Sequence, residues 1–493
     1  MEPLFELVKS MNQGEKRYFK RMGTLRSEFG SSNYIKLFDT IEKSKKYNEK
    51  KLILQFGKKF FAQNKRHLFT KILETLRTMH DTHSIEMQVR HSISEAEILT
   101  ERSLFSSAKH QIKSARKRAE KHELFLEQVR INSTELEVLS RENDLNNLNE
   151  RIEEYKKLNK IVSDKIENQL LFEELYSALV ELNQRIELVR SEPEEKSLQT
   201  VMAHPLLSNV NRALSLKSKN HYFYIHGLAH FFLGEFSESL KYFRQQLILI
   251  NRNNWIGVNK LTSLKSMGNV CLLCIKTNDK HGYGEAYAKL EKYSATSLYE
   301  KQYYWYLTYL IKLLSFDSIS QNNNAIAFVE ENLDKTVAIK KWIREHDTMH
   351  LEYCYSTFKT VEVFMFNKSP RKALRYINEF LNNADAELKQ DTYCIARIIN
   401  LLIHFELENV ELLENEIKSA HRYLSHRDRI YGFEQSILKF LNKAINLPAN
   451  ENYKMLWTIL NSDWNKLQND RFEKQVFQYF DFMRWLELKM DNK

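Results

Sequence analysis

The chain has 493 residues, 43% of them hydrophobic and 12% aromatic, and a formal net charge of +10. Its 11 glycines and 5 prolines are well below the shares of about 7% and 5% that are usual in globular proteins. An α/β enzyme or a β-sandwich of this length needs many glycine-containing turns, so the composition argues against both and predicts an all-α fold. Because the length exceeds one compact core, we expect several domains or, preferably, a quasi-linear stack of helix pairs.

The excess of positive charge is confined to residues 1–80, which contain 18 Lys or Arg and 8 Asp or Glu. The rest of the chain contains 56 of each, so it is neutral overall. We therefore predict a basic N-terminal helical module, residues 1–80, followed by a neutral helical body. Asn12 and Glu15 have the spacing of a capping box, which predicts that a helix begins there.

Six residues of this module are candidates for a basic surface: Lys16, Arg17, Lys20, Arg21, Lys58 and Lys59. The first four form two pairs, each spaced by one helical turn, which places a basic stripe on one helix. Such a stripe can contact phosphates, and its binding is then sensitive to salt. The alternative is that lysine-rich helices simply solvate their outer faces with lysine. No zinc-finger spacing or aromatic RNA-binding motif favours nucleic acid.

A first set of helix pairs is predicted over residues 81–190. Apolar periodicity indicates helices over residues 83–99, 104–121, 127–143, 145–160 and 164–190. The sequence RSEPEEK at Arg190–Lys196 places a proline among charged residues, which is typical of a loop. We expect it to mark a break in the stack at residues 191–205.

The clearest repeat unit lies within residues 220–250. Its aromatic, small and turn residues have tetratricopeptide spacing, and they are Phe223, Gly227, Gly234, Phe236, Ser239 and Phe243. The unit resembles the tetratricopeptide-repeat family, with Ser239 where alanine is usual and Asn251 where proline usually closes the unit. The resemblance implies tetratricopeptide-like repeats over residues 206–471, which form an α-solenoid of long helix pairs. Such repeats are binding scaffolds that rarely carry chemistry.

Markers of the second helix of each pair recur through this region. They are Ser239/Phe243, Ala286/Leu290, Ala325/Val329, Ala373/Ile377 and Leu412/Glu416. Their intervals of 47, 39, 48 and 39 residues exceed the strict tetratricopeptide period of about 34, so we expect longer helices or loops. Pro370 after Ser369 predicts the first turn of a helix. Residues 472–493 are predicted to form a C-terminal capping helix, with its helical part over 472–489.

Two N-terminal segments, LVKSMNQGEKRYFKR and NYIKLFDTIEK, resemble the start of uncharacterised helical-repeat proteins from Bacteroidota. This resemblance implies a bacterial protein of the cytosol and transfers no functional residues. Four cysteines without regular spacing indicate a reducing compartment, and the N-terminus lacks the apolar core of a secretory signal. No uncharged apolar stretch of about 18 residues is present, so we predict a cytoplasmic protein without a membrane span.

Candidate chemistry is sparse. Cys271 and Cys274 form a lone C-x-x-C pattern in an apolar helix, where cysteine packs as a small hydrophobe. His346, His350 and Cys354 share one helical face that could hold zinc, but no fourth ligand is identifiable and we predict no metal site. No phosphate-binding glycine loop or nucleophile elbow is present, so we also predict no cofactor and no enzymatic activity.

Aromatic residues are the candidates for a partner groove. Tyr303, Tyr304 and Tyr306 lie on an aromatic-rich helix, and His221 and Tyr224 lie on the first helix of the clear repeat unit. Such residues clasp a peptide or stack on bases, and the alternative is that they pack between long helices. The leading prediction is a scaffold that binds a protein or peptide in a concave groove, while its basic module docks an acidic surface. The second prediction is a nucleic-acid-associated regulator whose basic module contacts phosphates. The oligomeric state does not follow from the sequence.

Overall fold

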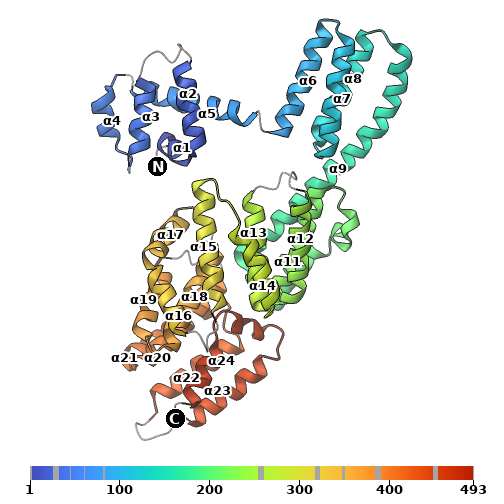
Figure 1. Ribbon diagram of the computed structural model, residues 1–493. Helices are drawn as coiled ribbons and strands as arrows, with labels where there is room; N and C mark the ends of the chain where they lie inside the picture. Colours follow the sequence, from blue (N-terminus) through green and yellow to red (C-terminus); the bar gives the residue numbers. More distant parts are fainter. Residues whose placement is uncertain are drawn as a thin grey trace. The chain divides into compact units, whose positions relative to one another are not determined.

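The computed structural model of the protein describes residues 3–25, 33–44, 46–59, 61–81, 84–253, 260–316, 322–346, 350–383, 390–447 and 454–491. These residues are mostly helical, and no β-strand occurs among them (Figure 1). The all-α class predicted from composition is therefore confirmed. Across the described part of the chain, no helix has both the length and the apolar character that crossing a bilayer requires.

The chain divides into two compact units. The first comprises residues 1–169 and 294–303, and the second comprises residues 170–293 and 304–493. The first unit begins with α1 (Pro3–Ser10), α2 (Gln13–Leu25), α3 (Asn33–Lys43), α4 (Glu49–Phe56) and α5 (Phe61–Asp81). These helices share one core, which includes Val8, Phe19 and Ile72. The predicted capping box is confirmed, because Asn12 N donates to Glu15 Oε2 (2.8 Å) and Glu15 N donates to Asn12 Oδ1 (2.9 Å).

Helices of equal length follow in the first unit. α6 (Ile85–Glu101), α7 (Phe105–Lys121) and α8 (Phe125–Arg141) have 17 residues each. Buried alanines at 96, 108 and 115 let them pack closely. α9 (Leu145–Arg185) has 41 residues and runs through the boundary between the units. The prediction of two helices over 145–160 and 164–190 was wrong, because no glycine or proline interrupts residues 145–185.

The second unit continues with consecutive helices, most of which pack on their neighbours in the chain. They are α10 (Glu192–Met202), η2 (Pro205–Ser208), η3 (Val210–Arg212), α11 (Leu216–Phe232), α12 (Phe236–Arg252), α13 (Lys260–Lys276), α14 (Lys280–Glu291), α15 (Leu298–Ser315), α16 (Asn322–Glu331), α17 (Leu333–His346), α18 (His350–Phe366), α19 (Pro370–Asn383), α20 (Gln390–Glu406), α21 (Val410–Ser425), α22 (Gly432–Ile445), α23 (Lys454–Leu467), η4 (Glu473–Gln478) and α24 (Phe482–Asp491). The predicted break at 191–205 is largely helical, because Pro193 lies in the first turn of α10, where its missing N–H costs nothing. α19 begins at Pro370, as predicted.

One turn type joins many of these helices. Its central residue has φ between 52° and 71°, and the residues at this position are Ser103, Glu123, Asn143, Gly234, Asn278, Lys368 and Glu408. The next helix begins two residues later in every case. The N–H of the following residue bonds to the carbonyl five positions back, as from Glu235 to His230 (2.9 Å) and from Asn409 to His404 (3.2 Å). The turn therefore closes the helix end and reverses the chain within three residues.

Helix length explains the long repeat period. Helices of 17 residues joined by this turn give a two-helix interval of 40 residues, which separates the starts of α6 and α8. The unit at 220–250 packs as predicted, since a Cβ on Gly227 would lie 2.8 Å from the Phe243 ring. Ser239 Oγ donates to Gly227 O (2.7 Å), which explains serine in place of alanine.

The prediction for α21 was wrong by one residue. Leu412 is 46% exposed, and the side chains that face inward are Leu413 and Ile417. The predicted capping helix was also wrong in its first half, because η4 occupies Glu473–Gln478 and α24 begins at Phe482. The apolar residues of this segment explain the difference, because Val476 and neighbouring aromatic side chains are buried inside the unit.

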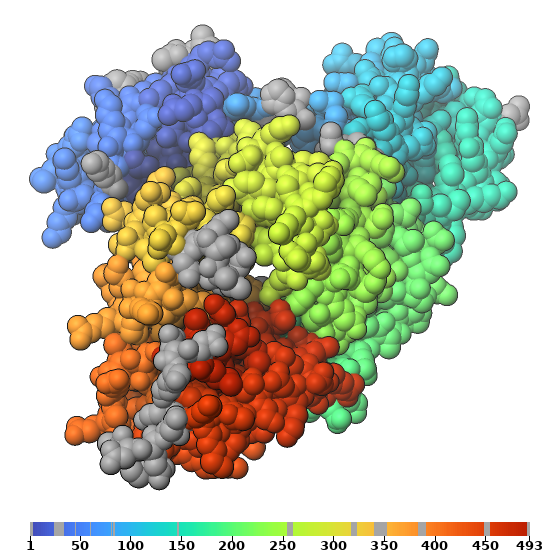
Figure 2. All heavy atoms as spheres, turned by 60° about the horizontal axis from the view of Figure 1, so that its bottom comes forward, coloured from blue at the N-terminus to red at the C-terminus, as the bar shows by residue number. Residues whose placement is uncertain are grey.

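The C-terminal segment of the second unit contacts the ends of α11 and α13. Gln475 Nε2 donates to Leu233 O (2.8 Å), and Lys276 Nζ lies 3.4 Å from Gln478 Oε1. Figure 2 shows the red C-terminal residues directly beside the green residues of α11–α14. The run of helices in this unit thus closes on itself.

Candidate functional site

Two of the basic candidates on α2 are neutralised by α3. Lys20 Nζ lies 2.7 Å from both Asp39 Oδ1 and Glu42 Oε2, and Lys16 Nζ lies 3.7 Å from Glu42 Oε1. Burial lowers the pKa of Lys20, but its hydrogen bonds to the two carboxylates outweigh burial and raise it. These lysines hold α2 to α3, so two of the four cations of the predicted stripe are paired with carboxylates.

The other four candidates, Arg17, Arg21, Lys58 and Lys59, are exposed. Lys58 and Lys59 follow α4, which ends at Gly57 with φ of 83°. Figure 1 draws α3 between α4 and α2. The structure therefore places the candidates on α2 and in the turn after α4, and does not gather them in one stripe.

Exposed charge in the module is nevertheless almost entirely positive. Among the described residues of 3–81, eleven basic side chains are exposed, whereas the exposed acids are Glu6 and Glu49. The densest run surrounds α4 and consists of Lys46, Lys50, Lys51, Lys58 and Lys59. The remaining acids described in this range are half-buried, as the pairs of α2 with α3 illustrate, so the net charge is displayed outward.

His221 and Tyr224 brace α11 against its neighbours. The rings of both lie near Tyr176 of α9, at 4.8 Å and 5.1 Å between centroids, and Tyr224 also meets Phe243 edge-on at 5.8 Å. Burial lowers the pKa of His221, and the nearby Lys217 lowers it further. These two candidates therefore pack between helices and offer a partner only part of their surface.

The three candidates on α15 differ in exposure. Tyr303 and Tyr306 are 2% and 0% exposed, and the Tyr306 hydroxyl is hydrogen-bonded to Ser356 Oγ. Tyr304 is half-buried and stacks on Tyr293, with 5.9 Å between ring centroids. Only Tyr304 presents substantial surface.

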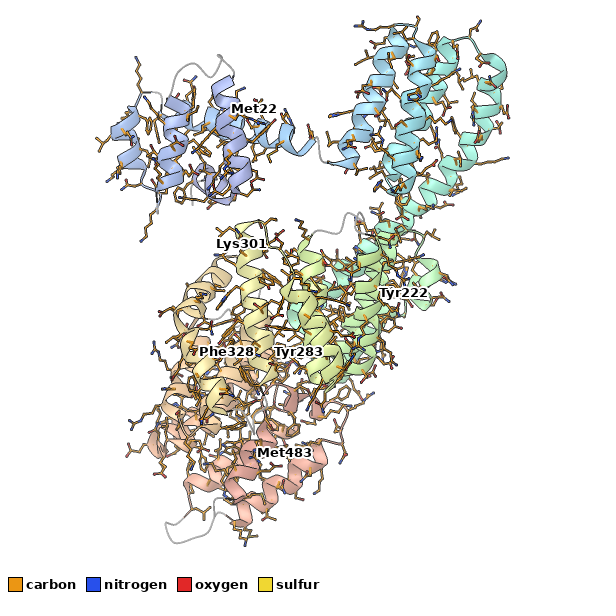
Figure 3. The ribbon with its side chains drawn as sticks, viewed as in Figure 1. Met22, Tyr222, Tyr283, Lys301, Phe328 and Met483 are labelled. Atoms are coloured by element: carbon orange, nitrogen blue, oxygen red, sulfur yellow. The ribbon has the colours of Figure 1, made fainter. Side chains whose placement is uncertain are left out.

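Tyr304 belongs to a group of half-buried rings, Tyr283, Tyr287, Tyr293 and Tyr304, which we name the tyrosine cluster. Tyr283, labelled in Figure 3, stacks on Tyr287 one turn later on α14 at 5.6 Å. Burial raises the pKa of Tyr287 to about 12, and the neighbouring Tyr283, Glu291 and Tyr304 add to the effect. Burial also raises the pKa of Tyr283 and Tyr304, so the hydroxyls of Tyr283, Tyr287 and Tyr304 are protonated at neutral pH. Sequence reasoning missed the α14 pair, although its spacing of four residues was visible.

The sequence analysis also missed a set of buried charges where the ends of the second unit meet. The side chains of Arg190 and Glu434 are fully buried, and Arg190 donates to both carboxylate oxygens (2.7 and 3.2 Å). Burial opposes the positive charge of Arg190, but Glu434 and then Asp391 outweigh it and raise its pKa. No local sequence signal pairs two residues that are 244 positions apart.

Arg429 extends this buried charge cluster. Its Nη1 lies 2.5 Å from Glu194 Oε1 and 3.1 Å from Asp391 Oδ1. Burial raises the pKa of Asp391 to about 7, against the lowering effect of Arg429 and Arg190. The cluster therefore ties the start of the second unit to α20 and α22.

Polar contacts fix the segment that contains η4. Glu473 accepts from Gly432 N (2.5 Å) and Phe433 N (3.1 Å), the first amides of α22, where a carboxylate is favoured. Asp481 N donates to Glu362 Oε2 (3.2 Å). The segment is held at both ends and inserted between helices.

One lysine near this segment has an altered acidity. Burial lowers the pKa of Lys276 to about 8, although Glu187 and Glu362 raise it. Its ammonium lies over the rings of Phe236 (4.9 Å) and Tyr355 (5.5 Å). The lysine is cationic at neutral pH and stabilised there by aromatic faces.

The cysteine and histidine patterns provide no assembled site. Cys271 and Cys274 are buried in α13, and burial raises the pKa of Cys271 to about 12. Cys354 is buried, while the side chains of His346 and His350 lie outside the described residues. Within the described ranges, no group of three or more His, Cys, Asp or Glu is arranged to hold a metal ion.

The chain has no match among protein-family models, curated proteins or solved structures.

Proposed function

We propose that this chain is a tetratricopeptide-like scaffold that binds a protein or peptide partner and catalyses no reaction. The tyrosine cluster is the observation that supports this proposal most directly. Tyrosine offers a large contact area at low entropic cost and is enriched at the centres of interfaces. Four such rings, half-buried on and between α14 and α15, form a preorganised aromatic surface.

The binding surface in this proposal differs from the concave groove expected from sequence. Tyr303 and Tyr306 are buried, and Val476 and Tyr479 fill the interior of the second unit. The partner docks instead on the exposed portions of the tyrosine cluster. Because the hydroxyls of Tyr287 and Tyr304 keep their protons, they donate hydrogen bonds to backbone carbonyls of a peptide.

Selection from a displayed library of random peptides, with the full chain as bait, tests this proposal. We expect one peptide family to be enriched, and we expect Tyr287→Ala and Tyr304→Ala to weaken its binding at least about tenfold, or about 1.4 kcal/mol. Tyr423→Ala is the matched control, since that half-buried ring lies between Arg397 and Arg427 and should not affect binding. Failure to enrich any family, or equal binding by both cluster variants, contradicts the proposal.

The exposed cations of the N-terminal module favour a second candidate function, contact with nucleic-acid phosphates. Binding to duplex DNA and structured RNA over a salt series tests it. Each phosphate contact that is removed should reduce the salt slope by about one, so Arg17→Gln with Lys58→Gln should reduce it by about two. Absence of binding at low salt excludes this function.

For either function we propose a cytoplasmic location. All four cysteines are buried as free thiols, which suits a reducing compartment.

A further inference from the structure

The outer face of α4 carries an exposed leucine among lysines. Leu54 is 87% exposed, the largest value for a large hydrophobic side chain in the described ranges. Lys50 precedes it by one helical turn, Lys58 follows the end of the helix, and both are exposed. Leu52, on the opposite side of α4, is buried in the module core. The outward face therefore plays no part in that core.

No internal acid compensates this face. Among the described residues, no ion pair joins Lys50 or Lys58 to a carboxylate. Phosphates alone would satisfy the lysines but would leave Leu54 without an apolar contact. An apolar centre inside a charged rim is the anatomy of a protein interface.

α9 carries the opposite arrangement on one of its faces. Leu170 is 54% exposed, with Glu167 three residues before it and Glu174 four residues after it. Side chains at these spacings lie on the same side of a helix. Both glutamates are exposed, and within the described residues neither forms an ion pair, although the ammonium of Lys160 interacts electrostatically with Glu167. Nearby, Lys160 is paired with Asp164 and Lys217 with Glu173, while the ammonium of the half-buried Lys165 lies over the Phe125 ring.

We propose that the α4 face of one chain docks on the α9 face of a second copy. Leu54 packs on Leu170, and Lys50 and Lys58 face Glu167 and Glu174. Opposite charges on the rim favour encounter and set the register. Since each chain carries both faces, the contact is heterologous and joins copies head to tail, into a ring or an open chain. This association is independent of the proposed partner binding.

Sedimentation velocity of the full chain over protein concentrations of about 1–200 µM tests the inference. We expect the average mass to rise with concentration and to fall as salt screens the rim charges. Lys50→Glu with Lys58→Glu should abolish association, and so should Glu167→Lys with Glu174→Lys. An equimolar mixture of these two variants should associate again, because each retains the face that the other has lost. All four positions are exposed, and thermal unfolding checks that the variants stay folded.

Lys113→Glu with Lys121→Glu on α7 is the matched control, with the same spacing and exposed positions. It should associate like the wild type, whereas Leu54→Ala should weaken association about tenfold. A wild type that stays monomeric throughout, or a variant mixture that does not associate, overturns the proposal. Loss of duplex DNA binding by the lysine variant, with a monomeric wild type, would assign the α4 face to nucleic acid and overturn it equally.

Discussion

Two glycines inside helices of the second unit differ in the space that is available for a Cβ atom. A Cβ on Gly227 would lie 2.8 Å from the ring of the buried Phe243, whereas the Cβ position of the exposed Gly284 has no atom within 4 Å. We expect Gly227→Ala to lower the free energy of unfolding by about 1–3 kcal/mol, because the ring must move within a packed core. Gly284→Ala should raise it by about 0.5–1 kcal/mol, since alanine favours the helix. Chemical unfolding followed by circular dichroism measures both, and changes of the same sign would contradict this account.

A second prediction at this scale concerns the acidity of Asp391. Its pKa of about 7 in the folded chain exceeds the usual value of about 3.9, so the folded chain binds the proton more tightly than the unfolded chain. The stability from this group is therefore present at low pH and is lost as pH rises from about 4 to 7. Asparagine does not titrate. The free energy of unfolding of Asp391→Asn, minus that of the wild type, should increase by at most about 4 kcal/mol across this window.

Unfolding measured at several pH values tests this expectation. Below about pH 4 and above about pH 7 the difference should be constant. Parallel curves across the whole range would show that Asp391 keeps an ordinary acidity.

At the scale of elements, the recurrent turn explains how a glycine-poor chain makes sharp reversals. Seven residues of the described chain occupy the central position of this turn with positive φ. Gly234 is the one glycine among them. A side chain in this conformation costs about 1–2 kcal/mol, which the closing hydrogen bonds offset. The amphipathic helices on either side hold the turn in place.

Glu408 at one of these turns is exposed and has φ of 57°. We expect Glu408→Gly to raise the free energy of unfolding by about 0.5–1 kcal/mol, because glycine adopts this conformation without strain. Glu408→Ala is the control and should give no gain. A thermal melt of the three proteins is the measurement, and stabilisation by alanine equal to that by glycine would disprove the conformational explanation.

Much of the element pattern was predictable from local sequence. The capping box at Asn12, the start of α19 at Pro370 and the packing of Gly227 depend on residues close together in the chain. The continuous α9 was not predicted, although no glycine or proline interrupts residues 145–185 and Leu158, Ile161 and Val162 continue its apolar pattern. The slip from Leu413 to Leu412 in α21 has a similar cause, since consecutive leucines leave the helical phase ambiguous from sequence.

At the scale of the whole molecule, the buried charge cluster stabilises the closure of the second unit. Arg190 and Glu434 are both fully buried, and removing one partner of such a pair leaves an uncompensated charge. We expect Glu434→Gln to lower the free energy of unfolding of this unit by about 3–5 kcal/mol. Glu414→Gln at the exposed Lys418 pair should change it by less than about 1 kcal/mol.

Calorimetry of the full chain checks this prediction. The transition of the second unit should move to lower temperature in Glu434→Gln, while that of the first unit stays unchanged. A shift of equal size in Glu414→Gln would show that burial does not decide the effect.

The candidate site was less predictable than the fold. Tyr304 was identified because aromatic residues are dense around it, yet burial separated it from Tyr303 and Tyr306. Lys16 and Lys20 looked like free charge because Asp39 and Glu42 lie on another helix. Burial and pairing of this kind depend on three-dimensional contacts, which helical periodicity does not encode.

The closure of the second unit has a consequence for protein synthesis. Arg190 and Glu194 leave the ribosome more than 230 residues before their partners Glu434 and Arg429. At a synthesis rate of about 5–20 residues per second, Glu434 and Arg429 are made roughly 10–50 seconds after Arg190 and Glu194. During that interval Arg190 has no Glu434 and the place of Tyr479 is empty. A nascent chain that stops early therefore keeps an incomplete interior, which molecular chaperones and proteases can recognise.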